Sequence, residues 1–578
     1  MPSTYHMVLI NLAATALFGI AVLTYRLVYP KRKFNYFIIF FLFSLLPLIS
    51  IFRNGVYESG DFNYNIYKSM SLAATLADGS FPAAWARDLN ATYGYPLFLF
   101  TYPLPYYIVV FVHSLGLSFI VSLKVFLALS FLASGALMFA WLKKQLGELS
   151  AFVGSIFYLF APYHLIDLHY RVAIGEVLSF VFLPLNFLCV FQMTKTNKKR
   201  WYILESLALA ALILSHQAIS LAASPFIFFY FLLLWQSKRN RKQLFIGLFS
   251  FVLGLCLSSF YWLPVLIESK FALQYFNATI VFPKFWEFFY SPWRYGFLFQ
   301  GPLGQLSFVL GYTQWLIVFL SVYLFFKKKV NKQTKLLFLF SLISFFIIFF
   351  MMNTISKPLW YLFPILLNFQ FSYRLLVLAV FFVSILGAII TKVYNNKPFL
   401  LIIVLLAVIP TVLNWGNRRV ISTITDQTLQ NNLPYSTSQG EGLWPAKPLW
   451  TNPKISWMSQ IPQSHLEVLE GSANLKELKR KTTLHSYFVS TSTNVLLKEN
   501  TWYFPGWKVF DNGKPVPVKF LKAHPGIIAF SLSNGEHNIS VVFDQTPDRT
   551  IGKFLSLLSL TVVFIVLLSR RIKLRLLP

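Results

Sequence analysis

Long apolar stretches recur along this chain and are separated by short polar connections. Each runs for about 15 to 25 residues, the length that predicts a membrane-spanning helix. They lie at residues 7–25, 34–52, 118–141, 150–167, 170–192, 202–216, 218–236, 243–266, 305–326, 336–352, 373–391, 398–415 and 552–570. The pattern therefore predicts a mainly α, polytopic membrane protein with about 13 spans.

Polar residues dominate residues 416–551, where the period changes. Val489 to Phe543 alternates between apolar and polar positions, which predicts β-strands. Asp511-Asn-Gly513 and Ser533-Asn-Gly535 have the composition of hairpin turns. We therefore expect a transmembrane domain at 1–415 with a large loop at 53–117, a β-sandwich-like domain at 416–551, and a final anchor with a basic tail at 552–578.

Basic residues gather in the short connections between spans. The net charge is +30, yet runs such as Lys195–Arg200 and Lys327–Lys332 lie between apolar stretches, where positive charge marks the cytoplasmic side. This placement argues against a nucleic-acid partner. It predicts a multi-pass protein of the plasma membrane with loop 53–117 and the β domain outside. Residues 97–116 begin and end on the outer side, which predicts a re-entrant or surface-lying segment.

The large first loop carries carboxylates that are candidates for chemistry. Glu58, Asp61, Asp78 and Asp88 lie in it, although the chain has only 20 acids among 578 residues. Carboxylates at a membrane surface can act as a general base or bind a metal ion. The alternative is an ordinary solvated loop, and we assign Asp78, beside Gly79, to such a turn.

Further ionisable residues lie at the predicted outer ends of later spans. They are Arg171, Glu176, His216 and Arg374. An ionisable side chain in a span is by default functional or paired. Arg171 can pair with Asp167, four residues before it. Five residues separate Glu176 from Arg171, which points Glu176 elsewhere; the alternative is that Glu176 and Arg171, which share the outer end of one helix, form a structural pair. His164, Asp167 and His169 fit no standard zinc spacing.

Aromatic side chains interrupt the outer loops. Trp85, Tyr102 and Trp293 are candidates for contacting a substrate, and the alternative is an interfacial aromatic belt. Phosphate-binding P-loops and dinucleotide fingerprints are missing from the sequence, so nothing in it supports ATP-driven pumping or dinucleotide chemistry.

An ordered set of short motifs resembles a known family. The set contains Gly60-Asp61, Trp85, Tyr93-Gly-Tyr-Pro-Leu-Phe98, Tyr102-Pro-Leu-Pro-Tyr-Tyr107, Arg171 with Glu176, Ser215-His216, Ser291-Pro-Trp293 with Tyr295-Gly296, and Gln370-Phe-Ser-Tyr-Arg374. This order is similar to that of bacterial membrane proteins described as 6-pyruvoyl-tetrahydropterin synthase related. The tail, with Phe504-Pro-Gly-Trp507, is similar to YfhO-type proteins, and the whole resembles GT-C membrane glycosyltransferases.

The resemblance implies a function that the residues alone do not give. It implies transfer of a sugar from a polyprenyl-phosphate donor to a glycan, lipid or protein acceptor at the external face, for assembly or modification of the cell envelope. Asp61 matches the loop acid, which would act as the base or bind a divalent cation, Mg²⁺ or Mn²⁺, with Glu58, Asp88 or Glu176 as second carboxylate.

Two departures and two rival functions stay open. Asn65 stands where the family often has a histidine, and Arg374 follows Ser-Tyr in place of Pro-Trp. In this interpretation Arg171 and Arg374 would neutralise the leaving phosphate and His216 would add a hydrogen bond. The rivals are a lipid or lipid-linked glycan transporter, which predicts helices broken near mid-membrane, and a non-catalytic partner in envelope assembly.

Overall fold

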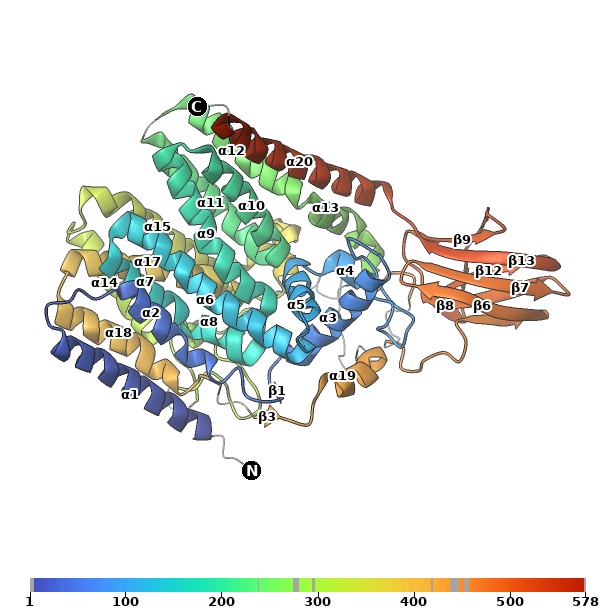
Figure 1. Ribbon diagram of the computed structural model, residues 1–578, viewed down its shortest axis with the longest axis horizontal. Coiled ribbons are helices and arrows are strands. Elements are labelled where there is room, and N and C mark those ends of the chain that lie inside the picture. The colour runs from blue at the N-terminus through green and yellow to red at the C-terminus, as the bar shows by residue number, and fades with distance from the viewer. Residues whose placement is uncertain are drawn as a thin grey trace. The chain divides into compact units, whose positions relative to one another are not determined.

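The computed structural model describes residues 5–237, 239–273, 280–293, 297–416, 419–436, 446–451 and 457–575 (Figure 1). Every predicted span falls on a helix or on a broken pair of helices. The longer helices are α1 (Tyr5–Val28), α2 (Tyr36–Ser44), α3 (Phe62–Ala77), α5 (Leu104–Ser114), α6 (Phe119–Leu146), α7 (Glu148–Leu159), α9 (Ile174–Thr196), α10 (Lys199–Ser215), α11 (Gln217–Gln236), α12 (Arg241–Leu257), α13 (Ser259–Glu268), α14 (Tyr312–Phe326), α15 (Lys332–Met352), α17 (Leu376–Tyr394), α18 (Lys397–Val412) and α20 (Pro547–Arg575). Shorter ones are α4 (Leu97–Phe100), α8 (Pro162–Ile166), α16 (Lys357–Leu362) and α19 (Asp426–Asn432).

Fewer helices are long and apolar enough to cross a membrane than the number of apolar stretches predicts. Among the described residues, 7 helices are long and apolar enough, or up to 9 if each bent pair counts as one span. The bent pairs are Glu148–Leu159 with Pro162–Arg171, at 50°, and Arg241–Leu257 with Ser259–Phe271, at 66°. The predicted count of about 13 is therefore not confirmed, because several apolar stretches fold as shorter helices. These are Tyr36–Leu48, Tyr312–Phe326 and Pro398–Val412, while the short helix α5 lies in the segment that the sequence predicts not to be a simple span.

The chain divides into two compact units. The first contains residues 1–62, 120–255 and 278–424, and it is helical. Its central helix is α17, which packs on α7, α14 and α15. Every residue of α17 from Leu376 to Thr391 is buried, which agrees with a helix that is apolar on all sides. A second group packs α9 against α10 and α11.

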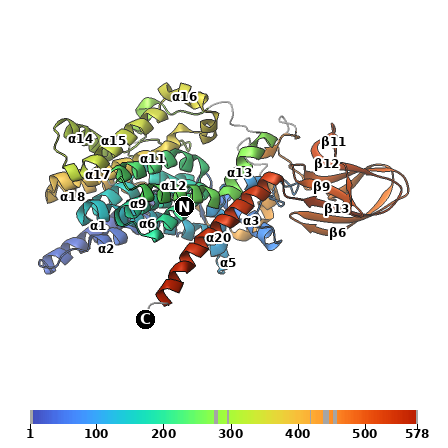
Figure 2. The same ribbon diagram turned by 90° about the horizontal axis from the view of Figure 1, so that it is seen from above.

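The second unit contains residues 63–119, 256–277 and 425–578, and it includes two antiparallel sheets (Figure 2). One has the strand order β10-β9-β13-β7-β6 and the other β11-β12-β8-β5. The strands are β5 (Leu466–Glu470), β6 (Ala473–Lys481), β7 (Leu484–Thr491), β8 (Val495–Trp502), β9 (Trp507–Asp511), β10 (Lys514–Val516), β11 (Lys519–Leu521), β12 (His524–Leu532) and β13 (Gly535–Phe543). The predicted C-terminal β domain is thus present.

One of the two predicted hairpins is wrong. Asn512 and Gly513 both have positive φ and join β9 to β10, which pair as neighbours, so this hairpin is confirmed. Ser533-Asn-Gly535 joins β12 to β13, which lie in different sheets. That segment is a crossover between the sheets, because β13 pairs with β7 and β9 instead.

The domain boundaries differ from the predicted ones. Most of the large loop and the segment 256–277, which includes α13, group with the C-terminal region. Asp78 shows why: its carboxylate accepts hydrogen bonds from the backbone N–H and the hydroxyl of Thr482, both at 2.8 Å, and pairs with Arg87 at 2.6 Å. Asp78 therefore ties the loop to the sheets and is not a solvated turn residue.

Candidate functional site

An irregular turn between two apolar helices in the first unit creates the site. Helix α8 continues into the π-helical turn η2 (Asp167–Arg171), which ends at Val172 in the left-handed conformation, with φ at 55°. A positive φ is unusual for a β-branched residue, and π-helical turns often accompany functional sites. Helix α9 then starts at Ile174, so the chain reverses direction within two residues.

This reversal brings two buried carboxylates onto one guanidinium. Arg171 donates from Nη1 to Asp167 Oδ1 at 2.5 Å and from Nη2 to Glu176 Oε1 at 2.8 Å. The hydroxyl of Tyr163 donates to Glu176 Oε2 at 2.7 Å. The prediction that Asp167 and Arg171 pair is confirmed. The prediction that Glu176 points elsewhere is wrong, because the left-handed Val172 breaks the helical spacing on which it rests. The alternative, a pair of Arg171 and Glu176, is confirmed.

Arg374 reaches the same carboxylate from another part of the chain. It lies in the turn η8 (Ser372–Leu375), just after Gln370, which has φ at 64°. Its Nε lies 3.2 Å from Glu176 Oε1, and its Nη1 donates to the carbonyl of Phe369 at 2.8 Å. Two guanidiniums thus share Glu176, a side chain that is almost wholly buried.

The first loop is attached to the π-helical turn by its backbone. The N–H of Gly60 donates to the carbonyl of Tyr170, and the N–H of Asp61 donates to the carbonyl of Arg171, both at 2.8 Å. Asp61 itself is exposed. The structure therefore fixes the main chain of Asp61 to the residue whose side chain holds Glu176.

His216 completes the set that the structure brings together. It is the N-cap of α11, where its Nδ1 accepts from the N–H of Ile219 at 3.4 Å. It is buried and lies within electrostatic range of Arg374, Glu176 and Arg171. Asp61, Arg171, Glu176, His216 and Arg374 all belong to the first unit.

The other candidate acids have different surroundings. Glu58 is half-buried, and its backbone N–H donates to the carbonyl of Arg419 at 2.9 Å. Asp88 belongs to the second unit and pairs with Arg87 at 3.1 Å. Burial raises the pKa of the Asp88 carboxyl, while the charge of Arg87 acts against that rise.

The candidate aromatic residues differ in their exposure. Trp85 is 1% exposed and packs edge-on against Trp507, with ring centroids 5.3 Å apart, so it is a core residue of the second unit. Tyr102 is half-buried and stacks on Tyr106, and Trp293 is half-buried in the first unit. Tyr295 and Gly296, which share a motif with Trp293, lie outside the described residues.

The described residues do not form a metal centre of their own. No three His, Cys, Asp or Glu side chains among them lie together as metal ligands. In the trio considered from sequence, the His164 ring stacks on Phe180 at 3.8 Å and its Nδ1 bonds with the carbonyl of Tyr158. Arg171 engages the carboxylates of Asp167 and Glu176. A cation bound by Asp61 thus stays a prediction.

Two tyrosines in the cluster are not identified from sequence as site residues. Besides its bond to Glu176, Tyr163 accepts from Arg171 Nη1 at 2.7 Å. The ring of Tyr373 lies 5.6 Å from the Arg171 guanidinium. The signal for Tyr373 is its place directly before Arg374, whereas nothing local marks Tyr163 because its partner follows 13 residues later.

Comparisons with known proteins give one family and several distant structures. The sequence model of the family described as "6-pyruvoyl-tetrahydropterin synthase related domain; membrane protein" matches residues 99–419. A protein of Lactococcus lactis subsp. cremoris (strain MG1363), described as uncharacterized, is 24% identical over 334 residues, which are 54% of this chain and 53% of that protein. The chain therefore spans about half the length of the curated relative it matches.

Among solved structures, two transferases overlap partly with this chain. The arabinofuranosyltransferase AftD from mycobacteria aligns with 68% of this chain and 27% of its own, with 15% identity and a TM-score of 0.41. The oligosaccharyltransferase of Archaeoglobus fulgidus aligns with 68% of this chain and 56% of its own, with 13% identity and a TM-score of 0.39.

Proposed function

We propose that this chain, which belongs to the 6-pyruvoyl-tetrahydropterin synthase related family of membrane proteins, is a membrane glycosyltransferase. The donor would be a polyprenyl-phosphate-linked sugar, and the acceptor a glycan, lipid or protein of the cell envelope. One observation carries the proposal. An exposed carboxylate, Asp61, is bonded through its main chain to Arg171, and the guanidinium of Arg171 shares the buried Glu176 with Arg374.

Sugar transfer from a lipid phosphate needs the groups that this arrangement supplies. The acceptor hydroxyl must lose a proton as its oxygen attacks the anomeric carbon, and Asp61 is the exposed group that can take it. The bond from the anomeric carbon to the phosphate oxygen breaks, and the phosphate leaves with the electron pair. Arg171 and Arg374 would stabilise that growing negative charge.

Glu176 has a positioning role in this scheme. A guanidinium has five N–H donors in a rigid plane. Arg171 donates two hydrogen bonds to Glu176, and Arg374 forms an ion pair with it, so Glu176 positions both guanidiniums without using every donor. Arg374 is the more accessible of the two, with 15% of its side chain exposed against 10% for Arg171. We therefore assign the closer contact with phosphate to Arg374.

The charge pattern of the helices supports an outer location for the site. Helices α9 and α17 have Lys195 and Lys392 in their last turns, at the ends opposite to Glu176 and Arg374. Positive charge favours the cytoplasmic end of a span. The ends that hold Glu176 and Arg374 would then face outward, where a lipid-linked sugar donor is used.

A transporter of lipid-linked glycans is the second candidate, because two apolar helix pairs are bent by 50° and 66°. Broken helices are typical of transporters. The two functions differ in product, since a transporter moves the lipid-linked sugar without forming a glycosidic bond.

The test compares strains that differ at one carboxylate. A deletion strain would receive the native chain, Asp61→Asn, or the matched control Glu536→Gln, which changes an exposed acid of β13. Mass spectrometry would measure envelope glycans and lipid-linked sugars at equal protein levels. We expect Asp61→Asn to lose transfer by about 10²-fold or more and to accumulate the lipid-linked donor as the deletion does.

Glu536→Gln should restore the native pattern. Full glycan transfer by Asp61→Asn would overturn the assignment of the base. Movement of labelled lipid-linked sugar across the membrane by the native chain, with no new glycosidic bond formed, would favour the transporter.

A further inference from the structure

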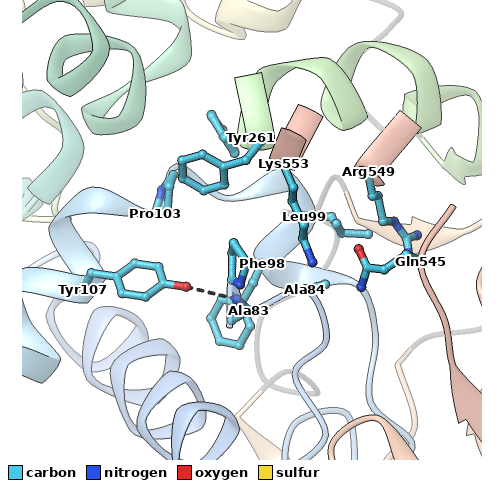
Figure 3. A pocket seen from close by; sticks show the side chains of 12 residues that line it. Ala83, Ala84, Phe98, Leu99, Pro103, Tyr107, Tyr261, Gln545, Arg549 and Lys553 are labelled. Carbon is cyan, nitrogen blue, oxygen red and sulfur yellow. Dashed lines mark hydrogen bonds between the residues drawn. The ribbon is translucent and has the colours of Figure 1, made fainter. Parts of the chain in front are cut away.

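A pocket in the second unit is lined by none of the residues assigned above, and three separate segments of the chain build it (Figure 3). Pro82, Ala83 and Ala84 come from the loop after α3, and further residues come from α4, α5 and α13. The remaining wall is the start of α20, with Lys553 and Arg549. All of these residues belong to one unit, so the pocket is a feature of that unit alone.

The walls of the pocket are mostly apolar and aromatic. Phe98, Leu99 and Pro103 line one part, and Phe260 and Tyr261 line another. Tyr107 is fixed there, since its hydroxyl accepts a hydrogen bond from the N–H of Ala83 at 3.0 Å. Aromatic rings with polar tips are typical of the membrane interface.

Two cations enter this apolar pocket, and they differ in what holds them. Arg549 is 2% exposed and donates from Nη2 to Glu268 at 2.7 Å and to the carbonyl of Pro505 at 2.8 Å. Its charge is therefore balanced within the protein. Lys553 lies one helical turn later, so its side chain is on the same face of α20.

Lys553 has no such balance within the part of the chain that the structure describes. Neither a hydrogen bond nor an ion pair is found there for its ammonium group, and the charged neighbour that acts on it is Arg549, a like charge. Figure 3 shows the ammonium reaching down toward Phe98 and Ala84. A cation in an apolar pocket needs a counter-ion or costs free energy.

The position of Lys553 in its helix indicates the counter-ion. Helix α20 starts at Pro547 and is apolar enough to span a membrane over Pro547–Leu568. Lys553 lies in the second turn, and thus near the level of lipid headgroups if this helix spans the bilayer. Lys553 is also held in place, because Ser259 Oγ of α13 bonds to the carbonyl of Gly552 at 2.9 Å.

We propose that this pocket binds the phosphate of a membrane lipid, with Lys553 as the cation and the aromatic walls against the lipid chain. The ligand class is a lipid phosphate, either of an anionic phospholipid or of a polyprenyl phosphate. The site goes beyond the proposed transfer reaction. Because its test measures lipid binding and not sugar transfer, it can succeed or fail independently of that reaction.

The test is native mass spectrometry of the full chain in mild detergent. The probes are phosphatidylglycerol, undecaprenyl phosphate and the zwitterionic phosphatidylcholine. The native chain and Lys514→Gln, a matched loss of an exposed lysine in β10, should retain one anionic lipid equally. Lys553→Gln should bind it about fivefold more weakly, the contribution of one lysine near a membrane surface, and Lys553→Arg should restore most of the binding.

A second variant tests the pocket without changing Lys553, and the comparison of the two anionic lipids identifies the source of the phosphate. Ala84→Leu leaves Lys553 in place but fills the pocket, and it should also weaken binding. Dependence on Lys553 with both anionic lipids supports a general lipid-phosphate site, and dependence with undecaprenyl phosphate alone supports a site for the carrier. The proposal would be overturned if Lys553→Gln and Ala84→Leu bound each of the two anionic lipids as tightly as the native chain does.

Discussion

Two buried carboxylates in this molecule are both held by arginine, but on different kinds of backbone. Glu499 in the β domain lies on a strand, and its Oε1 receives bonds from Arg480, His485 and Tyr487 at 3.1, 2.9 and 3.1 Å. All four residues stand on strands of the two sheets. Glu176 in the helical unit receives its arginines from irregular backbone, next to the left-handed Val172 and after Gln370.

The comparison shows that burial of charge does not by itself mark a functional site. Both carboxylates are almost wholly buried and paired. Glu176 differs from Glu499 in two ways. Val172 and Gln370, which precede Glu176 and Arg374 in the chain, have positive φ, and the exposed Asp61 is bonded to the turn that holds Arg171. Strained conformations persist where the surrounding structure enforces them, and they concentrate at functional sites. We therefore interpret Glu499 as structural and Glu176 as part of the site.

The largest difference between the two clusters is expected when one arginine in each is replaced by lysine. Arg374→Lys keeps the charge but loses the planar fork that meets Glu176 and the carbonyl of Phe369. We expect sugar transfer to fall by about 10²- to 10³-fold, the usual loss on removing one charge-stabilising donor, with a melting temperature close to native. Transfer would be measured by the strain assay above.

Arg480→Lys is the matched control in the β domain. It removes the guanidinium that bonds Glu499, Tyr487 and Thr501, so the unfolding free energy of the sheets should fall by about 1–3 kcal/mol. Sugar transfer should stay native. If the two variants showed the same loss of transfer, or if only Arg480→Lys lost transfer, the division into site and structural cluster would be wrong.

Acid pH tests whether Glu499 is a structural group that stabilises the sheets. Burial alone would raise the pKa of Glu499, but the groups around it, His485 and Arg480 first, hold that pKa at about 2, below the ordinary 4.5. A carboxyl with a lowered pKa in the folded state adds stability above its unfolded pKa, and that stability is lost as pH falls. The β domain should therefore lose about 3 kcal/mol between pH 4.5 and 2.

Hydrogen exchange of peptides from β7 and β8 in the full chain, corrected for intrinsic rates, would measure this loss. Glu499→Gln removes the titrating group, so its stability should depend less on pH over the same range than that of the native chain. Identical pH dependence of the two proteins would show that other carboxyls, and not Glu499, control the acid stability of the sheets.

Much of the fold follows from the sequence, whereas the connections of the site do not. Span positions are predictable because length and apolarity decide whether a helix suits a membrane. Helical spacing does not predict the bond between Glu176 and Arg171, because nothing in Val172 signals a left-handed residue; only their shared place at the outer end of one helix indicates that they can pair. Trp85 illustrates the same limit, since its packing partner Trp507 lies more than 400 positions later.

The crossover at Ser533-Asn-Gly535 has a related cause. A local turn composition indicates where the chain reverses, but it does not indicate whether the flanking strands pair with each other. In this molecule β13 finds its partners in β7 and β9, which occur earlier in the chain. Long-range pairing decides the sheet, and the turn residues are compatible with either outcome.

The smallest change that tests the comparison is a single methyl group at Gly60. A Cβ there would lie 3.3 Å from the carbonyl oxygen of Arg171, tighter than an ordinary contact. The loop must give way by a few tenths of an ångström, and the adjoining bond from the Asp61 N–H to that carbonyl must shift with it. Because small misplacements of a reacting group slow a reaction strongly, we expect Gly60→Ala to lower transfer about tenfold.

Stability should change little in Gly60→Ala, by less than about 1 kcal/mol, because Gly60 is exposed. Gly19→Ala in α1 is the matched control, since a Cβ there meets nothing within 4 Å. Both variants would be compared by melting temperature and by the strain assay. Native transfer by Gly60→Ala would mean that the bond between Asp61 and Arg171 does not position the base, and the distinction drawn between Glu176 and Glu499 would then depend on the arginines alone.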